Sequence, residues 1–441
     1  MKVPKPPPAL DGLIAGLAPE RVNELLTQQL PPDLRYRHWS TLRFVPPPEG
    51  MTSVEWWLAT KMARSTNLRP LPLLTSLGRP VQVAVPDAGH EMLHHIDQQA
   101  AGTIKGSRHL ADGIDSDRYI VSSLMEEAIT SSLLEGAATT HKQAKELLRS
   151  GRPARTRGEF MVRNNYDAMH LIRENRAHPL TPGLVLRLHE TITHDTLEDP
   201  SAAGRLQRPD EERVVVATHE GAILHQPPPA DQLVDRLDQL CAFANGEEVG
   251  FFIHPVVRAV LVHYWLAHDH PFVDGNGRAA RALFYWAMLH RGYWLAEYLS
   301  ISSLLYKAPA KYARAFLYTS TDGYDATYFV LNQLKIICRS IDALDDYLDR
   351  KVRQLSEAES RIRATVNLNH RQRALLGHAL SHPRFGYTFA SHAASHGVVY
   401  QSGRTDLLGL EEKGLLTSHK VGKRYVFVAV SDLDHRLAEL S

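Results

Sequence analysis

Two apolar helical segments are separated by eight residues that suit no hydrophobic core. Residues 254–269 (HPVVRAVLVHYWLAHD) and 278–293 (RAARALFYWAMLHRGY) carry apolar side chains at helical spacing. The segment between them, HPFVDGNG at 270–277, combines a histidine, an acid, an asparagine and two glycines. Glycine lets the backbone approach an anion closely, and the next helix begins with free N–H groups and a positive dipole end. The sequence therefore predicts an anion site on a loop between two packed helices.

The side chains around this loop supply the groups that phosphoryl or nucleotidyl transfer needs. His270 can exchange a proton near pH 7, and Asp274 offers an oxygen ligand suited to Mg²⁺. Arg278 and Arg281 are three residues apart on one helix face and can reach terminal phosphates in fork geometry. Three consecutive residues can form the anion nest itself: Gly275, Asn276 and Gly277.

The string HPFVDGNGRAAR at 270–281 resembles, at every defining position, the HPFx(D/E)GNGRxxR motif of Fic-domain proteins. The resemblance implies a mainly α fold, a helical bundle with the motif between two central helices. It also implies transfer of AMP from ATP, with Mg²⁺, to a Ser, Thr or Tyr hydroxyl of a target protein or of the chain itself. Glycine at position 277 fits nucleotidyl transfer, because the kinase-like branch of the family has lysine there.

The same resemblance gives each residue of the motif a role. His270 would deprotonate the target hydroxyl, which then attacks the α-phosphate. Asp274 would hold Mg²⁺ between the α- and β-phosphates. Arg278 would contact the β-phosphate, and Arg281 the γ-phosphate. The remaining contacts to the phosphates would come from Gly275, Asn276 and Gly277.

A second motif lies upstream of the loop. SSLLEG resembles the family's inhibitory motif, with Ser131, Glu135 and Gly136 at the defining positions, and it ends the helical segment 118–136. A carboxylate on a neighbouring helix can pair with Arg281 and keep it from the γ-phosphate, so the resemblance implies autoinhibition. The same glutamate can position a water that removes AMP, which leaves a de-AMPylase or a bifunctional enzyme as the alternative.

Two further elements concern the target segment and the nucleotide base. Residues 213–229 (RVVVATHEGAILHQPPP) hold two β-runs around THEG, which predicts a hairpin. By the resemblance this hairpin is a flap that holds the target by strand addition. Its predicted contacts are Val215, Val216, Ile223 and Leu224, although hairpin core is an equal alternative for the last two. Tyr312 resembles a family aromatic that borders the base, and a tyrosine of the bundle core is the alternative.

The C-terminal residues predict a separate unit. Residues 366–441 show three helical patterns and then two strands, the order of a winged helix-turn-helix domain. Residues 361–441 hold 11 Lys plus Arg and 6 Asp plus Glu, a modest positive excess. Contact with DNA, through Arg404 and Arg424, and protein docking or dimerisation both stay open. A DNA-binding regulator that senses nucleotide is therefore a further alternative to a transferase.

Length and composition set the remaining expectations. A chain of 441 residues predicts two or three domains. We expect a Fic-associated segment at 1–115, the Fic domain with its inhibitory helix at 116–350, and a connector helix with the winged helix at 351–441. The two cysteines, the absence of a secretory signal and the lack of a long apolar run predict a cytoplasmic protein without a membrane span. The resemblance adds a homodimer as one arrangement.

A histidine motif outside the loop points to a different chemistry. HEMLH at 90–94 matches the HExxH pattern of zinc proteases. The chain holds 24 histidines, so this match alone is weak, and no third ligand follows in context. We expect these residues to form the polar face of a helix.

Overall fold

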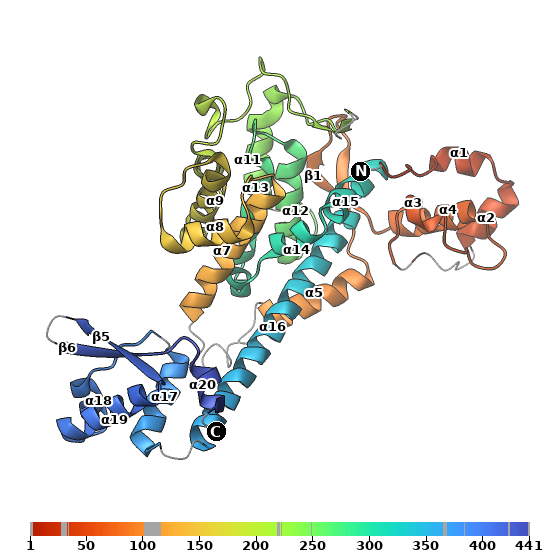
Figure 1. The fold of residues 1–441 in the computed structure, drawn as a ribbon. Helices are drawn as coiled ribbons and strands as arrows, with labels where there is room; N and C mark the ends of the chain where they lie inside the picture. The colour runs from red at the N-terminus through yellow and green to blue at the C-terminus, as the bar shows by residue number, and fades with distance from the viewer. Residues whose placement is uncertain are drawn as a thin grey trace. The chain divides into compact units, whose positions relative to one another are not determined.

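The computed structural model is mainly helical, and its described strands form three two-stranded sheets (Figure 1). This confirms the predicted fold class. The structure describes residues 3–27, 33, 35–100, 116–217, 221, 223–247, 249–364, 368–382, 384–421 and 424–439. The predicted domain boundary at residue 115 lies outside these ranges.

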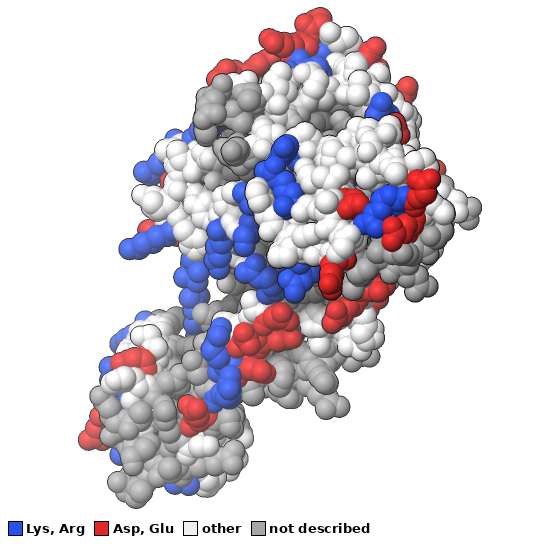
Figure 2. Space-filling model, turned by 90° about the vertical axis from the view of Figure 1, so that its right-hand side faces the viewer, with Lys and Arg blue, Asp and Glu red and all other residues white. Residues whose placement is uncertain are grey.

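The chain divides into two compact units. The first comprises Met1–Gly102 and Tyr119–Asp342, and the second comprises Thr103–Arg118 and Ala343–Ser441. The predicted division into three parts stays a prediction. On the face shown in Figure 2, basic and acidic side chains of the described residues are intermixed, as expected for a net charge of +1.

The N-terminal part of the first unit is built from short elements. They are α1 (Leu10–Ala15), α2 (Pro19–Thr27), α3 (Trp39–Leu42), α4 (Ser53–Ser65), the antiparallel strands β1 (Arg69–Leu74) and β2 (Pro80–Val83), and α5 (Asp87–Ala100). Thr52 caps α4 in a capping box: its side chain accepts the N–H of Glu55, and Glu55 accepts the N–H of Thr52 in return. Trp56 and Trp57 of α4 are buried against Trp39.

The rest of the first unit is a helical bundle with one hairpin. Its helices are α7 (Ser116–Leu134), α8 (His141–Ser150), α9 (Arg157–Glu174), α10 (Pro182–Thr193), α11 (Leu233–Asn245), α12 (Pro255–Asp269), α13 (Asn276–His290), α14 (Ile301–Lys307), α15 (Pro309–Thr321) and the first part of α16 (Thr327–Ala364). The hairpin strands are β3 (Val216–Ala217) and β4 (Ile223–His225), and short 3-10 helices lie at Pro200–Ala202, Ala230–Gln232 and Trp294–Tyr298.

The two helices on either side of the loop form the centre of this bundle. Twelve of the fifteen residues are buried in α12, and twelve of fifteen in α13. A helix that is buried on almost every side belongs to the core, so the loop between these helices is held by the most rigid part of the unit. None of the helices in the described ranges combines the length and the hydropathy that a membrane span requires.

The second unit has a small core of its own. Its elements are α17 (His370–Ser381), α18 (Phe389–Ser395), α19 (Tyr400–Glu412), the antiparallel strands β5 (Leu416–Val421) and β6 (Arg424–Ala429), and α20 (Leu433–Glu439). Leu376, Leu407 and Phe427 are fully buried in this core. Helices followed by a hairpin are the order that the sequence predicts for a winged helix-turn-helix domain. Arg404 and Arg424 are exposed, and their contact with DNA stays a prediction.

Candidate active site

The predicted anion loop is closed by its own asparagine. Asn276 accepts the N–H of Phe272 at 2.9 Å and donates to the carbonyl of Phe272 at 2.8 Å. His270 ends α12 with φ 47°, and Gly275 precedes α13 with φ 85°. The side chain of Asn276 is therefore engaged inside the loop, and its predicted contact with a phosphate stays a prediction.

His189, which the sequence analysis did not identify, packs against the loop and supports it. His189 of α10 stacks on Phe272, with ring centroids 3.8 Å apart. Its Nδ1 accepts the N–H of Gly204 at 3.1 Å, so Nε2 carries the proton and donates to the carbonyl of Asp274 at 2.9 Å. Burial lowers the pKa of His189 to about 4, which keeps this tautomer neutral.

His270 is placed to act as a base. Its Nδ1 lies 3.4 Å from the carbonyl of Ala267, the side on which a ring N–H would donate, which leaves the lone pair on Nε2. Burial lowers the pKa of His270 below its ordinary value, so the ring is neutral at pH 7. Arg213 braces the backbone here, because its Nη2 donates to the carbonyls of Asp269 at 2.7 Å and His270 at 3.2 Å.

Arg278 has donors to spare for an anion. Its side chain is fully buried, and Nη1 donates to the carbonyl of Ile192 at 2.9 Å. Within the described part of the chain, Nε and Nη2 have no hydrogen-bond acceptor. Buried donors are nearly always satisfied in proteins, so the orphaned nitrogens indicate an acceptor that comes from outside the chain. A nucleotide phosphate fits this requirement.

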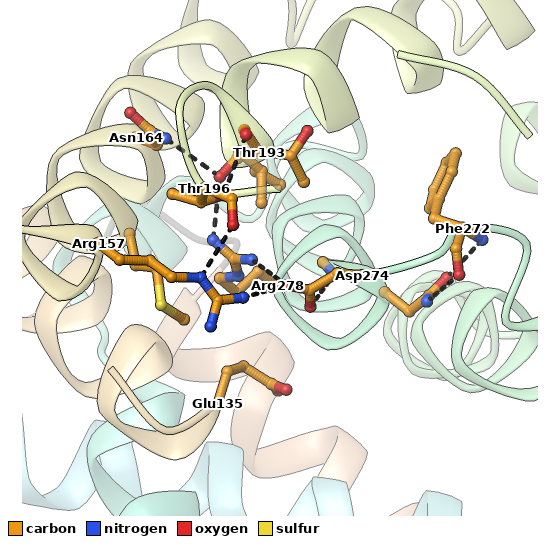
Figure 3. Close-up of polar contacts among 12 residues, drawn as sticks. Glu135, Arg157, Asn164, Thr193, Thr196, Phe272, Asp274 and Arg278 are labelled. Atoms are coloured by element: carbon orange, nitrogen blue, oxygen red, sulfur yellow. Dashed lines mark hydrogen bonds and ion pairs between the residues drawn. The ribbon is translucent and has the colours of Figure 1, made fainter. Parts of the chain in front are cut away.

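Asp274 carries the carboxylate predicted to bind Mg²⁺. Its Oδ1 accepts the N–H of Gly275 at 2.5 Å, and its Oδ2 lies 3.1 Å from Nη2 of Arg157 (Figure 3). The side chain is 39% exposed and can therefore be reached by a cation. A carboxylate oxygen next to a phosphate site is a ligand that Mg²⁺ accepts, so the residues present fit this metal. Arg157, which begins α9, gave no signal in the sequence.

Arg281 is fully engaged by the end of α7. Its Nε donates to Oγ of Ser131 at 2.9 Å, and its Nη2 lies 3.1 Å from the carbonyl of Ser131 and 2.9 Å from Oε1 of Glu135. Burial opposes the charge of Arg281, but Glu135, Tyr312 and Glu127 together outweigh it, and the pKa of Arg281 is raised. The structure thus brings together Ser131, Glu135 and Arg281, as the sequence predicts.

Two glycines allow Glu135 to reach Arg281: Gly277 in the first turn of α13, and Gly136 directly after Glu135. A Cβ atom at position 277 would lie 2.8 Å from Cδ of Glu135, closer than a carbon atom normally approaches, so a side chain here would collide with the carboxylate. Gly136 has φ 82° and lets the chain turn away directly after Glu135, with the N–H of Ala137 donating to the carbonyl of Ser132 at 3.0 Å. The end of α7 can therefore approach the first turn of α13 closely.

A buried acid, also missed in the sequence, fixes α7 in place. Glu127 is 1% exposed and accepts hydrogen bonds from the hydroxyl of Tyr285, from Oγ of Ser300 and from both N–H and Oγ of Ser302. Burial raises the pKa of Glu127. Because Glu127 lies two helical turns before Glu135, it sets the position of the inhibitory residue.

The predicted flap is present as a short antiparallel pair. Its register pairs Val216 with His225 and Ala217 with Ile223, and three residues of the THEG turn lie outside the described ranges. Ile223 is 60% exposed, and Val215 and Val216 are also exposed. Their exposure argues against hairpin core and leaves apolar side chains free for a partner, whereas Leu224 is half-buried.

Tyr312 lies in an aromatic cluster of the bundle. Its hydroxyl contacts Nε2 of His263 at 2.8 Å, and its ring meets the ring of Phe316 edge-on. Burial raises the pKa of Tyr312 to about 12. These contacts are those of a core tyrosine, and the predicted contact with the nucleotide base stays a prediction.

The HEMLH segment lies on α5. His94 contacts Gln98, one helical turn further on, through a 2.8 Å hydrogen bond. Across the described ranges, no three His, Cys, Asp or Glu side chains gather in a way that could hold a metal ion.

The loop, the buried Arg278 and Arg281 and the contact of Arg281 with Glu135 together form the candidate active site of a helical bundle. Residues 179–288 match the model of the Fic/DOC family, so the chain carries a Fic/DOC domain. The chain is 33% identical over 109 residues to protein adenylyltransferase Fic of Drosophila erecta, which covers 25% of this chain and 20% of that protein. It is 39% identical over 69 residues to the protein of the same name from Culex quinquefasciatus, covering 16% and 14%. The chain thus matches a fifth or less of these relatives' length.

The chain is also similar to solved structures. A Fic family protein from Desulfovibrio desulfuricans G20 is 17% identical with a TM-score of 0.49, over 79% of this chain and 97% of that chain. A Fic domain containing signaling protein from Bacteroides thetaiotaomicron VPI-5482 is 22% identical with a TM-score of 0.44, over 57% and 93%.

Proposed function

We propose that the chain is an autoinhibited protein adenylyltransferase. It transfers AMP from ATP to a Ser, Thr or Tyr hydroxyl of a target protein and of itself. The observation that carries the proposal is the 2.9 Å pair between Arg281 and Glu135, beside the orphaned donors of buried Arg278. The names of the relatives that match over the Fic segment support AMP as the transferred group.

The residues of the loop divide the chemistry among them. His270 accepts the proton of the attacking hydroxyl at Nε2, while the hydroxyl oxygen forms a bond to the α-phosphorus. The bond from that phosphorus to the bridging oxygen breaks, and pyrophosphate leaves. Arg278 and the N-terminus of α13 hold the leaving phosphates. Asp274 holds the divalent cation, which neutralises phosphate charge when it is bound.

Autoinhibition follows from the contacts of one arginine. Ser131 and Glu135 together take three contacts of the Arg281 guanidinium, so it cannot turn to a γ-phosphate. ATP then lacks the contact that would align its α-phosphorus with the attacking hydroxyl. Removal of Glu135 takes away the ion pair and leaves two contacts with neutral oxygens of Ser131, which a charged γ-phosphate can replace. The exposed edge and apolar side chains of the flap support a role in docking the target as an added strand.

The test is label transfer from α-³²P-ATP in the presence of Mg²⁺. We compare the wild type, Glu135→Gln, Glu135→Gly, and Glu135→Gly with His270→Ala. The proposal expects weak self-labelling of the wild type, intermediate labelling of Glu135→Gln and strong labelling of Glu135→Gly that His270→Ala abolishes. Equal labelling of the wild type and Glu135→Gly would refute autoinhibition, and no labelling in any variant would refute AMP transfer from ATP.

A second function, removal of AMP, is favoured by the place of Glu135. Its carboxylate is 34% exposed and acts electrostatically on His270, so it can reach a water in the same site. A de-AMPylase or bifunctional enzyme would release AMP from labelled protein when wild-type chain is added without ATP. Retained label would rule this function out.

The other expected partners have separate tests. A nucleotide-sensing DNA-binding regulator would bind duplex DNA through Arg404 and Arg424 and would be unaffected by His270→Ala. A homodimer would show in the mass measured by light scattering. The cytoplasmic location stays a prediction.

A further inference from the structure

Arg157 contacts the carboxylate of the motif, and the proposed chemistry gives it no role. It begins α9, and its Nε donates to the carbonyl of Thr196 at 2.9 Å. Its Nη2 lies 3.1 Å from Oδ2 of Asp274 (Figure 3). The side chain is 64% exposed, so these two contacts, rather than burial, hold the guanidinium at the site.

The carbonyl that anchors Arg157 belongs to a fixed turn. Thr196 is buried, and both its N–H and its Oγ1 donate to the carbonyl of Thr193 at 3.0 Å. Asn164, which lies on α9 with Arg157, donates to the carbonyl of His194 at 2.6 Å and so ties the turn to α9. The bond from Nε to Thr196 can therefore persist when Nη2 leaves Asp274.

The two oxygens of the Asp274 carboxylate have different neighbours. Its Oδ1 is taken by the N–H of Gly275, while Oδ2 faces Arg157 at 3.1 Å and Nη2 of Arg278 at 3.8 Å. Arg278 is buried and bonded to the carbonyl of Ile192, so it stays in place. A cation at Oδ2 would meet the positive charge of Arg157, which is exposed and can move away.

We propose that Arg157 is a positioning residue that occupies Asp274 until a divalent cation arrives with the nucleotide. The inference rests on the proposed function, in which Asp274 binds that cation. While it is paired, Arg157 holds the carboxylate in place and repels a free divalent ion. The negative phosphates of a nucleotide offset this repulsion, and Nη2 then leaves Oδ2. The site accordingly takes the metal as its nucleotide complex rather than as the free ion.

The test measures metal binding without turnover. Mn²⁺ is titrated into the full chain without nucleotide, and free Mn²⁺ is followed by its electron paramagnetic resonance signal. We expect Arg157→Gln to bind Mn²⁺ about three- to tenfold more tightly than the wild type, because an exposed competing charge is removed. Arg157→Lys keeps the positive charge but loses the planar guanidinium group, so its Mn²⁺ affinity should lie between those of the wild type and Arg157→Gln. Arg187→Gln, which removes an exposed arginine of α10, leaves the affinity unchanged.

Two further measurements make the result decisive. Asp274→Asn should abolish Mn²⁺ binding both in the wild type and in Arg157→Gln. When α,β-methylene ATP is present, the gain in Mn²⁺ affinity caused by Arg157→Gln should become smaller. The inference is overturned if Arg157→Gln binds free Mn²⁺ no more tightly than the wild type, or if Asp274→Asn retains the site. Failure of label transfer would refute the proposed function separately, because Mn²⁺ binding is read without any transfer.

Discussion

The carboxylate of Glu135 fills the space that a side chain at position 277 would need. A Cβ on Gly277 would lie 2.8 Å from Cδ of Glu135 and 3.2 Å from Nη1 of Arg281. Gly277 therefore has two effects: it leaves the backbone accessible to a phosphate, and it leaves space for the carboxylate of Glu135. This relationship couples the two motifs, although they lie more than 130 residues apart in the sequence.

Gly277→Ala should destabilise the wild type by about 1 kcal/mol, because the methyl group meets the Glu135 carboxylate, the end of a flexible and 34% exposed side chain, which has to move away from Arg281. In the Glu135→Gly background the same change should be neutral or slightly stabilising, since alanine favours a helix over glycine by about 1 kcal/mol. Thermal unfolding of the four proteins measures the coupling. Equal destabilisation in both backgrounds would contradict the arrangement.

Glu127→Gln should loosen α7. In Glu127→Gln the amide oxygen can keep the three donors that now meet Oε2, but the NH₂ group accepts nothing, so the Ser302 hydroxyl that now donates to Oε1 must turn and accept instead. We expect a loss of about 1–2 kcal/mol in the free energy of unfolding. Self-labelling should rise as Glu135 loses its support. Glu126→Gln, at a half-buried position of the same helix where the carboxylate contacts His141, is the control and should change stability by less than about 1 kcal/mol and leave labelling unchanged.

His189, which supports the loop, should make the protein less stable as the pH is lowered. Burial lowers the pKa of His189 to about 4, so between pH 6.5 and 4 the unfolded chain binds a proton that the folded chain does not. Stability from this group is complete above about pH 6.5 and decreases by up to about 1.4 kcal/mol for each pH unit below it. His189→Gln should reduce the slope of urea midpoints between pH 7 and 5. An unchanged slope would show that His189 titrates normally.

The pH dependence of transfer follows from His270. Burial lowers its pKa below the ordinary value, so the base stays unprotonated to a lower pH than a solvent-exposed histidine. Self-labelling by Glu135→Gly should therefore remain constant from pH 8 to below about 6.5 and fall only at lower pH. A loss of activity that begins above that pH would contradict the neutral, buried base.

The parts of the site that could be predicted from the sequence lie in short motifs that contain many functional residues. The string from His270 to Arg281 carries most of its chemistry within one loop and one helix turn, and the periodicity of α12 and α13 is unambiguous. The pairing of Glu135 with Arg281 was expected from a resemblance, and the structure brings the two residues together. The loop is predictable because its residues are neighbours in the sequence, whereas the contact between the distant Glu135 and Arg281 was expected from the resemblance alone.

The supporting residues could not be predicted in the same way. Arg157, His189 and Arg213 reach the loop from α9, α10 and the approach to the flap, and each looks like an ordinary helix or loop residue in its own segment. Glu127 stands beside Glu126 in α7, and only the fold decides that one is buried and the other half-buried. Their roles depend on tertiary contacts, which local patterns do not contain.

The central claim is that Glu135 keeps Arg281 from the nucleotide, and affinity for a non-transferable analogue tests it most directly. Calorimetric titration with α,β-methylene ATP and Mg²⁺ compares the wild type, Glu135→Gly, and Glu135→Gly with Arg281→Ala. Freeing one buried arginine for a charged contact worth about 1.5–3 kcal/mol predicts at least a tenfold gain in Glu135→Gly, which Arg281→Ala removes. Equal affinities of the wild type and Glu135→Gly would contradict the account.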